Sequence, residues 1–135
     1  MKKLYILLVI AFIGFVGKAQ IVNIPDANFK TRLLQADVTN QIARDVNFHF
    51  IKIDINGDGE IQSTEAEEVY SINVSYAFIN DLTGINSFIN LNYLDCSHNE
   101  LTALNVSGLT NLISLVCLLN QLPTIDLTGL KNLSI

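Results

Sequence analysis

The second half of the chain repeats itself, and this repeat constrains the fold more than any other feature of the sequence. Residues 91–111 read LNYLDCSHNELTALNVSGLTN and residues 112–132 read LISLVCLLNQLPTIDLTGLKN, so the period is 21 residues. A degenerate copy that is one residue longer occupies residues 69–90, and a partial copy occupies residues 133–135. Each copy has too little surface to bury its apolar side alone, so neighbouring copies must stack.

Within each copy, apolar residues alternate at the start, which is typical of a short strand with one buried face. In residues 91–96 the inward positions are Leu94 and Cys96, and Asn99 follows at a place where an amide turns the chain. In the first copy Ala77 replaces this asparagine. The pattern predicts an α/β repeat fold: a short solenoid of parallel strands with a period of 21–22 residues.

Residues 20–68 do not follow the repeat, and we interpret them as a small, mainly helical N-terminal cap that covers the first repeat. Asp26 is a typical N-cap residue, and the apolar spacing after it predicts a short helix over residues 27–35. A second short helix, capped by Ser63 or Thr64, is expected just before the repeats. The stretch over residues 42–53 fits both a helical face and an extended run.

The cap contains DINGDGEIQSTE (residues 54–65), which has the EF-hand spacing D-x-[DN]-x-[DN]-G-x5-E. A hard cation prefers about six or more oxygen ligands, and Gly59 permits the sharp bend between them. We therefore predict one structural Ca²⁺ site, whereas the alternative is an acidic surface turn, because N-G and D-G pairs favour turns by themselves. The predicted ligands are Asp54, Asn56, Asp58, the carbonyl of Glu60, Gln62 and Glu65.

Residues 1–19 are predicted to be a secretory signal peptide: two lysines, an apolar run too short to span a membrane, and small residues before Gln20. The alternative is an uncleaved membrane anchor. Cleavage leaves five basic residues against thirteen acidic ones, so the formal net charge changes from −5 to −8. An acidic protein without a basic cluster argues against a nucleic-acid partner, and no membrane insertion is expected after cleavage.

The repeats resemble the leucine-rich repeat, L-x-x-L-x-L/C-x-x-N-x-L, from residue 69 to residue 135. Together with IPDANFK (24–30), the acidic loop and DLTGI (81–85), the order of motifs resembles secreted leucine-rich-repeat proteins of Bacteroidetes-type bacteria. That resemblance implies a secreted or cell-surface protein-interaction or adhesion module. Such proteins commonly carry a C-terminal sorting domain, which this sequence lacks, so the alternative is an accessory module or fragment of a larger secreted enzyme or adhesin.

Outward positions of the predicted strands form one face that offers a surface for a protein or carbohydrate partner. The alternative is ordinary surface variation. The candidates for this recognition face are Asn73, Tyr93, Asp95, Val116 and Leu118.

The remaining reactive side chains do not predict an enzyme. His49 and His98 lack a partner at catalytic spacing, and no catalytic motif is present. Cys96 and Cys117 occupy equivalent inward positions, where two packed thiols are the simplest interpretation and a disulfide is the alternative.

Overall fold

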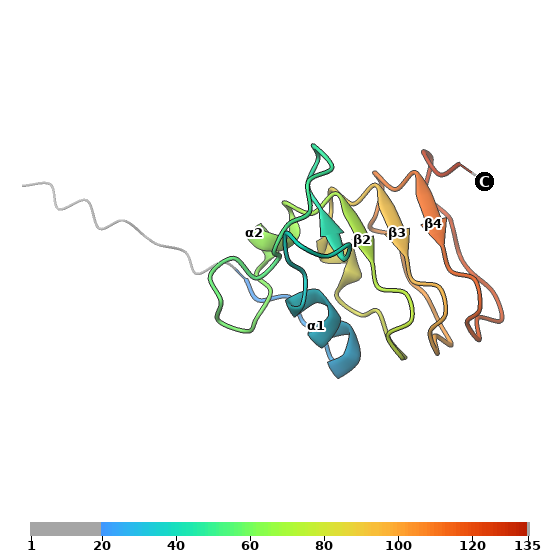
Figure 1. Ribbon diagram of the computed structural model, residues 1–135. Coiled ribbons are helices and arrows are strands. Elements are labelled where there is room, and N and C mark those ends of the chain that lie inside the picture. The colour runs from blue at the N-terminus through green and yellow to red at the C-terminus, as the bar shows by residue number, and fades with distance from the viewer. Residues whose placement is uncertain (1–19, 135) are drawn as a thin grey trace, which may run out of the picture.

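In the computed structural model, which describes residues 20–134, the repeats form one sheet (Figure 1). Strands β2 (Ser71–Asn73), β3 (Tyr93–Asp95) and β4 (Ser114–Val116) are parallel and lie in sequence order. The register aligns Ser71 with Tyr93 and Tyr93 with Ser114, which are steps of 22 and 21 residues. The parallel strands and their spacing therefore agree with the prediction. The predicted signal peptide over residues 1–19 lies outside the described residues.

The cap extends this sheet by one strand, which the sequence did not predict. Strand β1 (Ala43–Arg44) pairs antiparallel with β2, and an isolated bridge joins Arg44 to Phe50. Residues 42–53 are therefore not helical: Ile42 and Ile53 are buried, while Val46 lies exposed at the turn between them. Because β1 covers the edge of β2, the hydrogen-bonding groups of that edge are paired within the cap.

Two short helices complete the cap, so it is less helical than predicted. Helix α1 (Ala27–Leu34) buries Phe29 and Leu33, and its bounds agree with the prediction, with Gln35 as the C-cap. Helix α2 covers only Ser63–Ala66. Much of the cap is irregular because the acidic loop and the β1 turn take up most of its length.

Asp26 joins the cap to the first repeat. One carboxylate oxygen, Oδ1, accepts the N–H of Phe29 at 2.8 Å and caps α1 as predicted. The other, Oδ2, accepts the N–H groups of Asn80 (2.8 Å) and Asp81 (3.1 Å). Burial acts to raise the pKa of Asp26, but the N–H groups of Phe29, Asn80 and Asp81 outweigh it and lower the pKa. The ionised carboxylate therefore stabilises the junction.

The N-terminal segment of the cap also packs tightly on the first repeat. Gly84, which precedes the 3-10 helix η1 (Ile85–Ser87), has a φ of 103°. A Cβ added there would lie 2.8 Å from the carbonyl oxygen of Asn23 and 2.8 Å from a side-chain carbon of Ile24. Only glycine accommodates both the left-handed backbone and this close approach.

One continuous core runs from the cap through the repeats. Its largest fully buried side chains come from both parts, for example Phe29 and Ile53 from the cap and Phe88 and Leu94 from the repeats. No helix within residues 20–134 is long and apolar enough to cross a membrane.

Candidate functional site

The acidic loop folds around the carboxylate of Asp54. Its Oδ1 accepts the N–H of Gly57 at 2.8 Å, and its Oδ2 accepts the N–H of Gly59 at 3.2 Å. Both glycines have positive φ angles, 74° and 81°, which fold the backbone back over the carboxylate. Asp54 itself is 7% exposed. Gly59 therefore forms the sharp bend that was predicted for it, and Gly57 adds a second positive φ that was not predicted.

Glu65 closes the loop from the other end. Its Oε1 accepts the N–H of Ile55 at 2.8 Å, and its Oε2 accepts the N–H of Gln62 at 3.0 Å. Gln62 is the N-cap of α2, so the prediction of Ser63 or Thr64 as the cap is wrong. The reason is that the Glu65 carboxylate reaches back to the Gln62 N–H, which starts the helix one residue earlier than Ser63 would as a cap.

Asp58 is surrounded by hydrogen-bond donors. Its Oδ1 accepts the N–H of Glu60 at 2.9 Å, and its Oδ2 accepts amide N–H groups of Gln62 at 3.0 Å and Asn56 at 3.1 Å. The backbone N–H of Glu60 is the main reason that the pKa of Asp58 is lowered, and the two amides and the charge of Lys30 add to this effect against the opposing effect of burial.

The donor set of the loop fits calcium in chemical type but not in its present arrangement. Asn56 and Gln62 direct amide N–H groups at Asp58, so both would have to turn their oxygens inward to act as ligands. Within residues 20–134, no three or more His, Cys, Asp or Glu side chains are grouped closely enough to hold a metal ion. Coordination would therefore depend on the amide oxygens and the Glu60 carbonyl.

The loop is tied to the rest of the cap at two places. Ile21 bridges to Gln62, and the Val22 N–H donates to the carbonyl of Ile61 at 2.8 Å, so the exit of the loop pairs with the first described segment of the chain. The Lys30 ammonium on α1 lies 2.7 Å from a Glu60 carboxylate oxygen. Ile61 is fully buried. The loop therefore connects the N-terminal segment, α1 and α2.

The predicted recognition face is the outer face of β2, β3 and β4. The register brings Asn73, Asp95 and Val116 into one row across the sheet, and it places Tyr93 in the next row between Ser71 and Ser114. All of these side chains are half-buried. Four of the five predicted residues therefore lie together on the strands of one face.

Leu118 departs from this arrangement because it lies beyond the end of β4 and is 70% exposed. The residues at the same repeat position, Ser75 and Ser97, also turn away from an outward strand position. Each donates its N–H and its hydroxyl to the side chain two residues earlier, Asn73 or Asp95. Val116, two residues before Leu118, has no side-chain acceptor and leucine has no hydroxyl, so neither bond forms and Leu118 remains at the surface.

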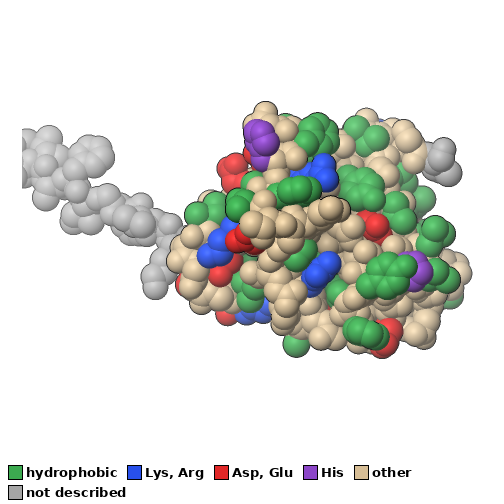
Figure 2. Space-filling view, in the orientation of Figure 1, with side chains coloured by type: hydrophobic (Ala, Val, Ile, Leu, Met, Phe, Trp, Pro, Cys, Tyr) green, Lys and Arg blue, Asp and Glu red, His purple; other side chains and the backbone are tan. Residues whose placement is uncertain are grey.

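A second row of surface residues was missed by sequence reasoning. Tyr76, His98 and Leu119 occupy the same repeat position, and all three have φ angles between 53° and 54°. The rings of Tyr76 and His98 are stacked with centroids 3.9 Å apart. Figure 2 shows hydrophobic side chains gathered beside one histidine on this part of the surface. Asn99 after His98 and Asn120 after Leu119 are the sequence signal for the turn, whereas Ala77 follows Tyr76.

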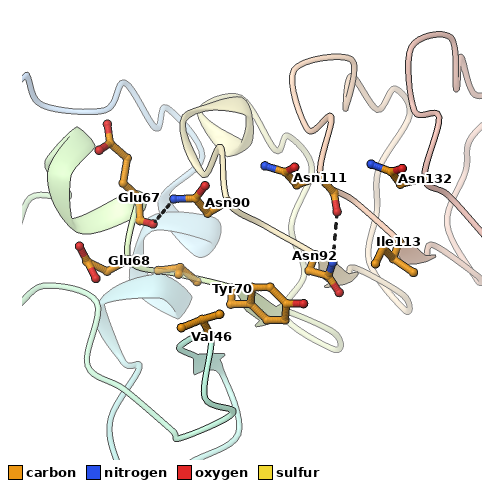
Figure 3. A pocket seen from close by; sticks show the side chains of 10 residues that line it. Val46, Glu67, Glu68, Tyr70, Asn90, Asn92, Asn111, Ile113 and Asn132 are labelled. Atoms are coloured by element: carbon orange, nitrogen blue, oxygen red, sulfur yellow. Dashed lines mark hydrogen bonds between the residues drawn. The ribbon is translucent and has the colours of Figure 1, made fainter.

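Two grooves adjoin the sheet. The first, of about 460 Å³, follows the starts of the strands and is shown in Figure 3 with Glu67, Glu68, Tyr70, Asn92 and other lining residues. The amide of Asn90 donates to the carbonyl of Glu67 at 2.8 Å, so part of this polar lining is used to join one repeat to the preceding segment. Its acidic residues make it electrostatically negative.

The second groove, of about 440 Å³, lies over the outer face itself, between the strands and the turn that follows β1. Phe48 on this turn and Tyr70 before β2 meet edge to face, with ring centroids 5.6 Å apart. The sequence suggested Tyr93 as part of this surface but gave no sign that Phe48, 45 residues earlier in the chain, lies beside it. The folding back of β1 brings them together.

The two cysteines are free thiols that occupy equivalent positions after β3 and β4. Cys96 is fully buried, and this burial, with a smaller effect from Cys117, raises its pKa to about 12. Cys117 is half-buried, and burial also raises its pKa. Because the thiolate is the reactive form, neither cysteine has the environment of a catalytic nucleophile.

No family model matches the chain, and no curated protein matches it either. Solved structures do. The functional domain of InlJ from Listeria monocytogenes, which includes a cysteine ladder, is 28% identical with a TM-score of 0.65. That match covers 87% of this chain and 23% of the InlJ chain in that structure, so this chain spans about a quarter of the length of that chain.

Two further structures show the same fold at lower identity. An internalin (inlF) from Listeria monocytogenes is 22% identical with a TM-score of 0.54, and the match covers 88% of this chain and 32% of that one. A structure of the CBM51-2 and INT domains of ZmpB from Clostridium perfringens is 22% identical with a TM-score of 0.52, covering 72% of this chain and 17% of that one. The fold is therefore like that of internalin repeat domains.

Proposed function

We propose that this chain is the recognition part of a secreted or cell-surface protein, and that it binds a protein or carbohydrate partner as an interaction or adhesion module. The observation that carries this proposal is the outer sheet face, where Asn73, Asp95 and Val116 form one row beside Tyr93 and an adjoining groove. The structural likeness to InlJ supports it, since a repeat fold presents its strands as one continuous surface.

A binding role fits the outer face better than a catalytic one. The side chains of Asn73 and Asp95 are held in place by the serines two residues later, so the face is rigid. His49 contacts Asp45 in an exposed turn, and His98 stacks on Tyr76. No hydrogen bond joins the side chain of either histidine to a serine or cysteine among the residues described, so we propose that the chain is not an enzyme.

The test of this function is saturable binding of the fluorescently labelled protein to fixed eukaryotic and bacterial cells, measured by flow cytometry. Val116→Lys places a charge on β4, in the row that Val116 forms with Asn73 and Asp95 on the outer face, and it is expected to abolish binding to the cells that bind the unchanged protein. Thr102→Lys adds the same charge at an exposed position outside the strands and is the matched control. Equal binding of the two variants, or no saturable binding by the unchanged protein, would contradict the proposal.

Calcium is proposed as a structural ion of the cap, with Asp54, Asn56, Asp58, the Glu60 carbonyl, Gln62 and Glu65 as its ligands. When bound, it would offset the negative charge of the Asp54, Asp58 and Glu65 carboxylates. Since the loop connects the N-terminal segment, α1 and α2, its stabilisation would hold the cap together. No second loop of this kind is present in residues 20–134 to form an EF-hand pair. A structural role for the ion is therefore favoured over a calcium-sensing role.

Thermal melting with and without Ca²⁺ tests this site. At a calcium concentration about 100 times the Kd, the free energy of unfolding is expected to rise by about 2.7 kcal/mol, with a matching rise in Tm. Asp58→Asn removes a charge at an exposed ligand and is expected to reduce the rise, whereas Glu100→Gln removes an exposed charge outside the loop and leaves the rise unchanged. An unchanged Tm in Ca²⁺ would rule out the site.

A second candidate function is that of an accessory module at the N-terminal side of a larger secreted enzyme or adhesin. The coverage of the structural matches favours it, because most of this chain corresponds to 23% of InlJ and 17% of the ZmpB structure. Sequencing the gene beyond codon 135 tests it directly: a downstream catalytic or anchoring domain in frame is the expected result, and a stop codon at once is the contrary one.

A further inference from the structure

We propose that the groove between the turn after β1 and the outer sheet face binds a neutral oligosaccharide. This inference rests on the proposed function, because it names the ligand class for the same face. The groove measures about 440 Å³, which is within the usual range for small-ligand sites of roughly 300–1,000 Å³. Three aromatic side chains line it: Phe48, Tyr70 and Tyr93.

The charge of the groove favours a neutral ligand. None of the chain's thirteen acidic residues lines it, and its single charged lining residue is Arg44. The Arg44 guanidinium already lies over the ring of Phe50, 4.4 Å from its centroid. A polyanion would meet the net negative charge of the protein, and a polycation would find no carboxylate here, unlike in the neighbouring groove with Glu67 and Glu68 (Figure 3).

Phe48, one of the aromatic residues that line the groove, has an unfavourable backbone conformation. Phe48 has a φ of 65°, which is unfavourable for a bulky residue, and yet it is 61% exposed. Asp45 stabilises this turn by accepting the N–H groups of Asn47 and His49, each at 2.9 Å. The exposed Phe48 ring packs edge to face on Tyr70, so this turn presents an aromatic surface to the groove.

Several polar groups of the groove are free to bind hydroxyls, although Asn73 accepts from Ser75 and Asn92 donates to the carbonyl of Asn111. Among the hydrogen bonds of residues 20–134, none engages the hydroxyls of Tyr70, Tyr93 or Ser71, and none engages the side-chain amide of Gln41. A pyranose ring offers flat C–H faces to aromatic rings and hydroxyls at its rim to such donors and acceptors. The charged side chains of a protein partner, in contrast, would find Arg44 as the single charged residue of this groove.

NMR titration of the ¹³C-tyrosine-labelled protein tests this inference with four probes: cellohexaose, N-acetylchitohexaose, xylohexaose and mannohexaose. At least one is expected to bind saturably and to shift the signals of Tyr70 and Tyr93 while leaving that of Tyr76 unchanged. Phe48→Ala is expected to weaken this binding about tenfold, equivalent to about 1.4 kcal/mol. Phe78→Ala is the matched control, because Phe78 is also exposed (71%) and also has a positive φ (54°).

The inference is overturned if none of the four probes shifts the Tyr70 or Tyr93 signals at millimolar concentration, or if both phenylalanine variants weaken binding equally. Periodate treatment of the cells, which cleaves glycan diols and spares most of the protein, separates this failure from failure of the proposed function. Val116-dependent binding that survives periodate, with no probe binding, retains the function and rejects the glycan. Absence of any cell binding rejects the function itself.

Discussion

The second and third repeats have nearly the same pattern, but the structure gives their equivalent residues different surroundings. Leu94 and Cys96 of the second repeat are fully buried, whereas Leu115 and Cys117 of the third are half-buried. The cause is the neighbours: β3 has a strand on each side, while β4 has β3 alone among the strands described. The burial of a repeat is therefore set by what lies beside it rather than by its own sequence.

The cap supplies the neighbour for the first repeat. Strand β1 pairs with β2, and the carboxylate of Asp26 accepts N–H groups from Asn80 and Asp81. This side of the sheet is therefore closed by both backbone pairing and a charged side chain. The cap side of the sheet is closed and the β4 side has no further strand among the residues described. Equivalent substitutions in the second and third repeats should therefore change the free energy of unfolding by different amounts.

The largest difference is expected between the equivalent core leucines. Leu94→Ala leaves a cavity in a fully buried site and is expected to lower the free energy of unfolding by about 4 kcal/mol. Leu115→Ala removes the same atoms from a half-buried site and is expected to cost about 2 kcal/mol. Urea denaturation measures both values, and equal losses would show that the two repeats are equally packed.

The equivalent asparagines give the next largest effect. The amide of Asn99 donates to the carbonyl of Val74 at 2.9 Å and accepts the N–H groups of Ala77 and Ile79, each at 3.1 Å. Asn99→Ala leaves these groups without a partner inside the protein and is expected to cost about 3 kcal/mol.

Asn120 is the matched position in the third repeat. It donates to the carbonyls of Cys96 (2.9 Å) and Cys117 (3.1 Å) but is half-buried, so water reaches the groups that it would leave. Asn120→Ala is therefore expected to cost about 1 kcal/mol in the same urea titration. If Asn120→Ala lowered the free energy of unfolding more than Asn99→Ala, the hydrogen bonds of Asn99 could not be the better buried of the two sets.

Asp26 tests the closed side of the sheet through pH. Asp26→Asn is expected to cost about 1 kcal/mol near pH 7, because the ionised carboxylate accepts the three N–H groups better than an amide. Its pKa is lowered in the folded state from the ordinary value of 3.8, so this stabilisation is present above that value and is lost as the pH falls below it. Denaturation of both proteins between pH 2 and 7 checks this, and a pH-independent difference would refute it.

The structural features that depend on the local spacing of residues in the sequence were predictable. The strand positions follow from the repeat, α1 follows from Asp26 and the apolar spacing after it, and the bend of the acidic loop follows from its glycines. Strand β1 was not predictable, because residues 43–44 become a strand only through pairing with residues 71–72, a long-range contact that two residues do not signal.

In the candidate sites, too, residues placed by the repeat were predictable, and residues placed by contacts between distant segments or by side-chain contacts were not. The row of Asn73, Asp95 and Val116 was predictable because a parallel register repeats one position per copy. Phe48 was not, since its place beside Tyr70 depends on the fold of the β1 turn. Nor was the Gln62 cap, which depends on the Glu65 side chain reaching back to its N–H.

Native-state hydrogen exchange across the three repeats measures whether the sheet is most stable on the side that the cap closes and least stable at β4. The amide of Asn73 donates to the carbonyl of Ile42 in the cap at 2.7 Å, and the amide of Val74 donates to the carbonyl of Asp95 on β3 at 2.8 Å. Both are expected to exchange only through global unfolding. Amides of β4 without a neighbour are expected to exchange faster by local opening. Protection that is equal in all three strands, or lowest beside the cap, would contradict this account.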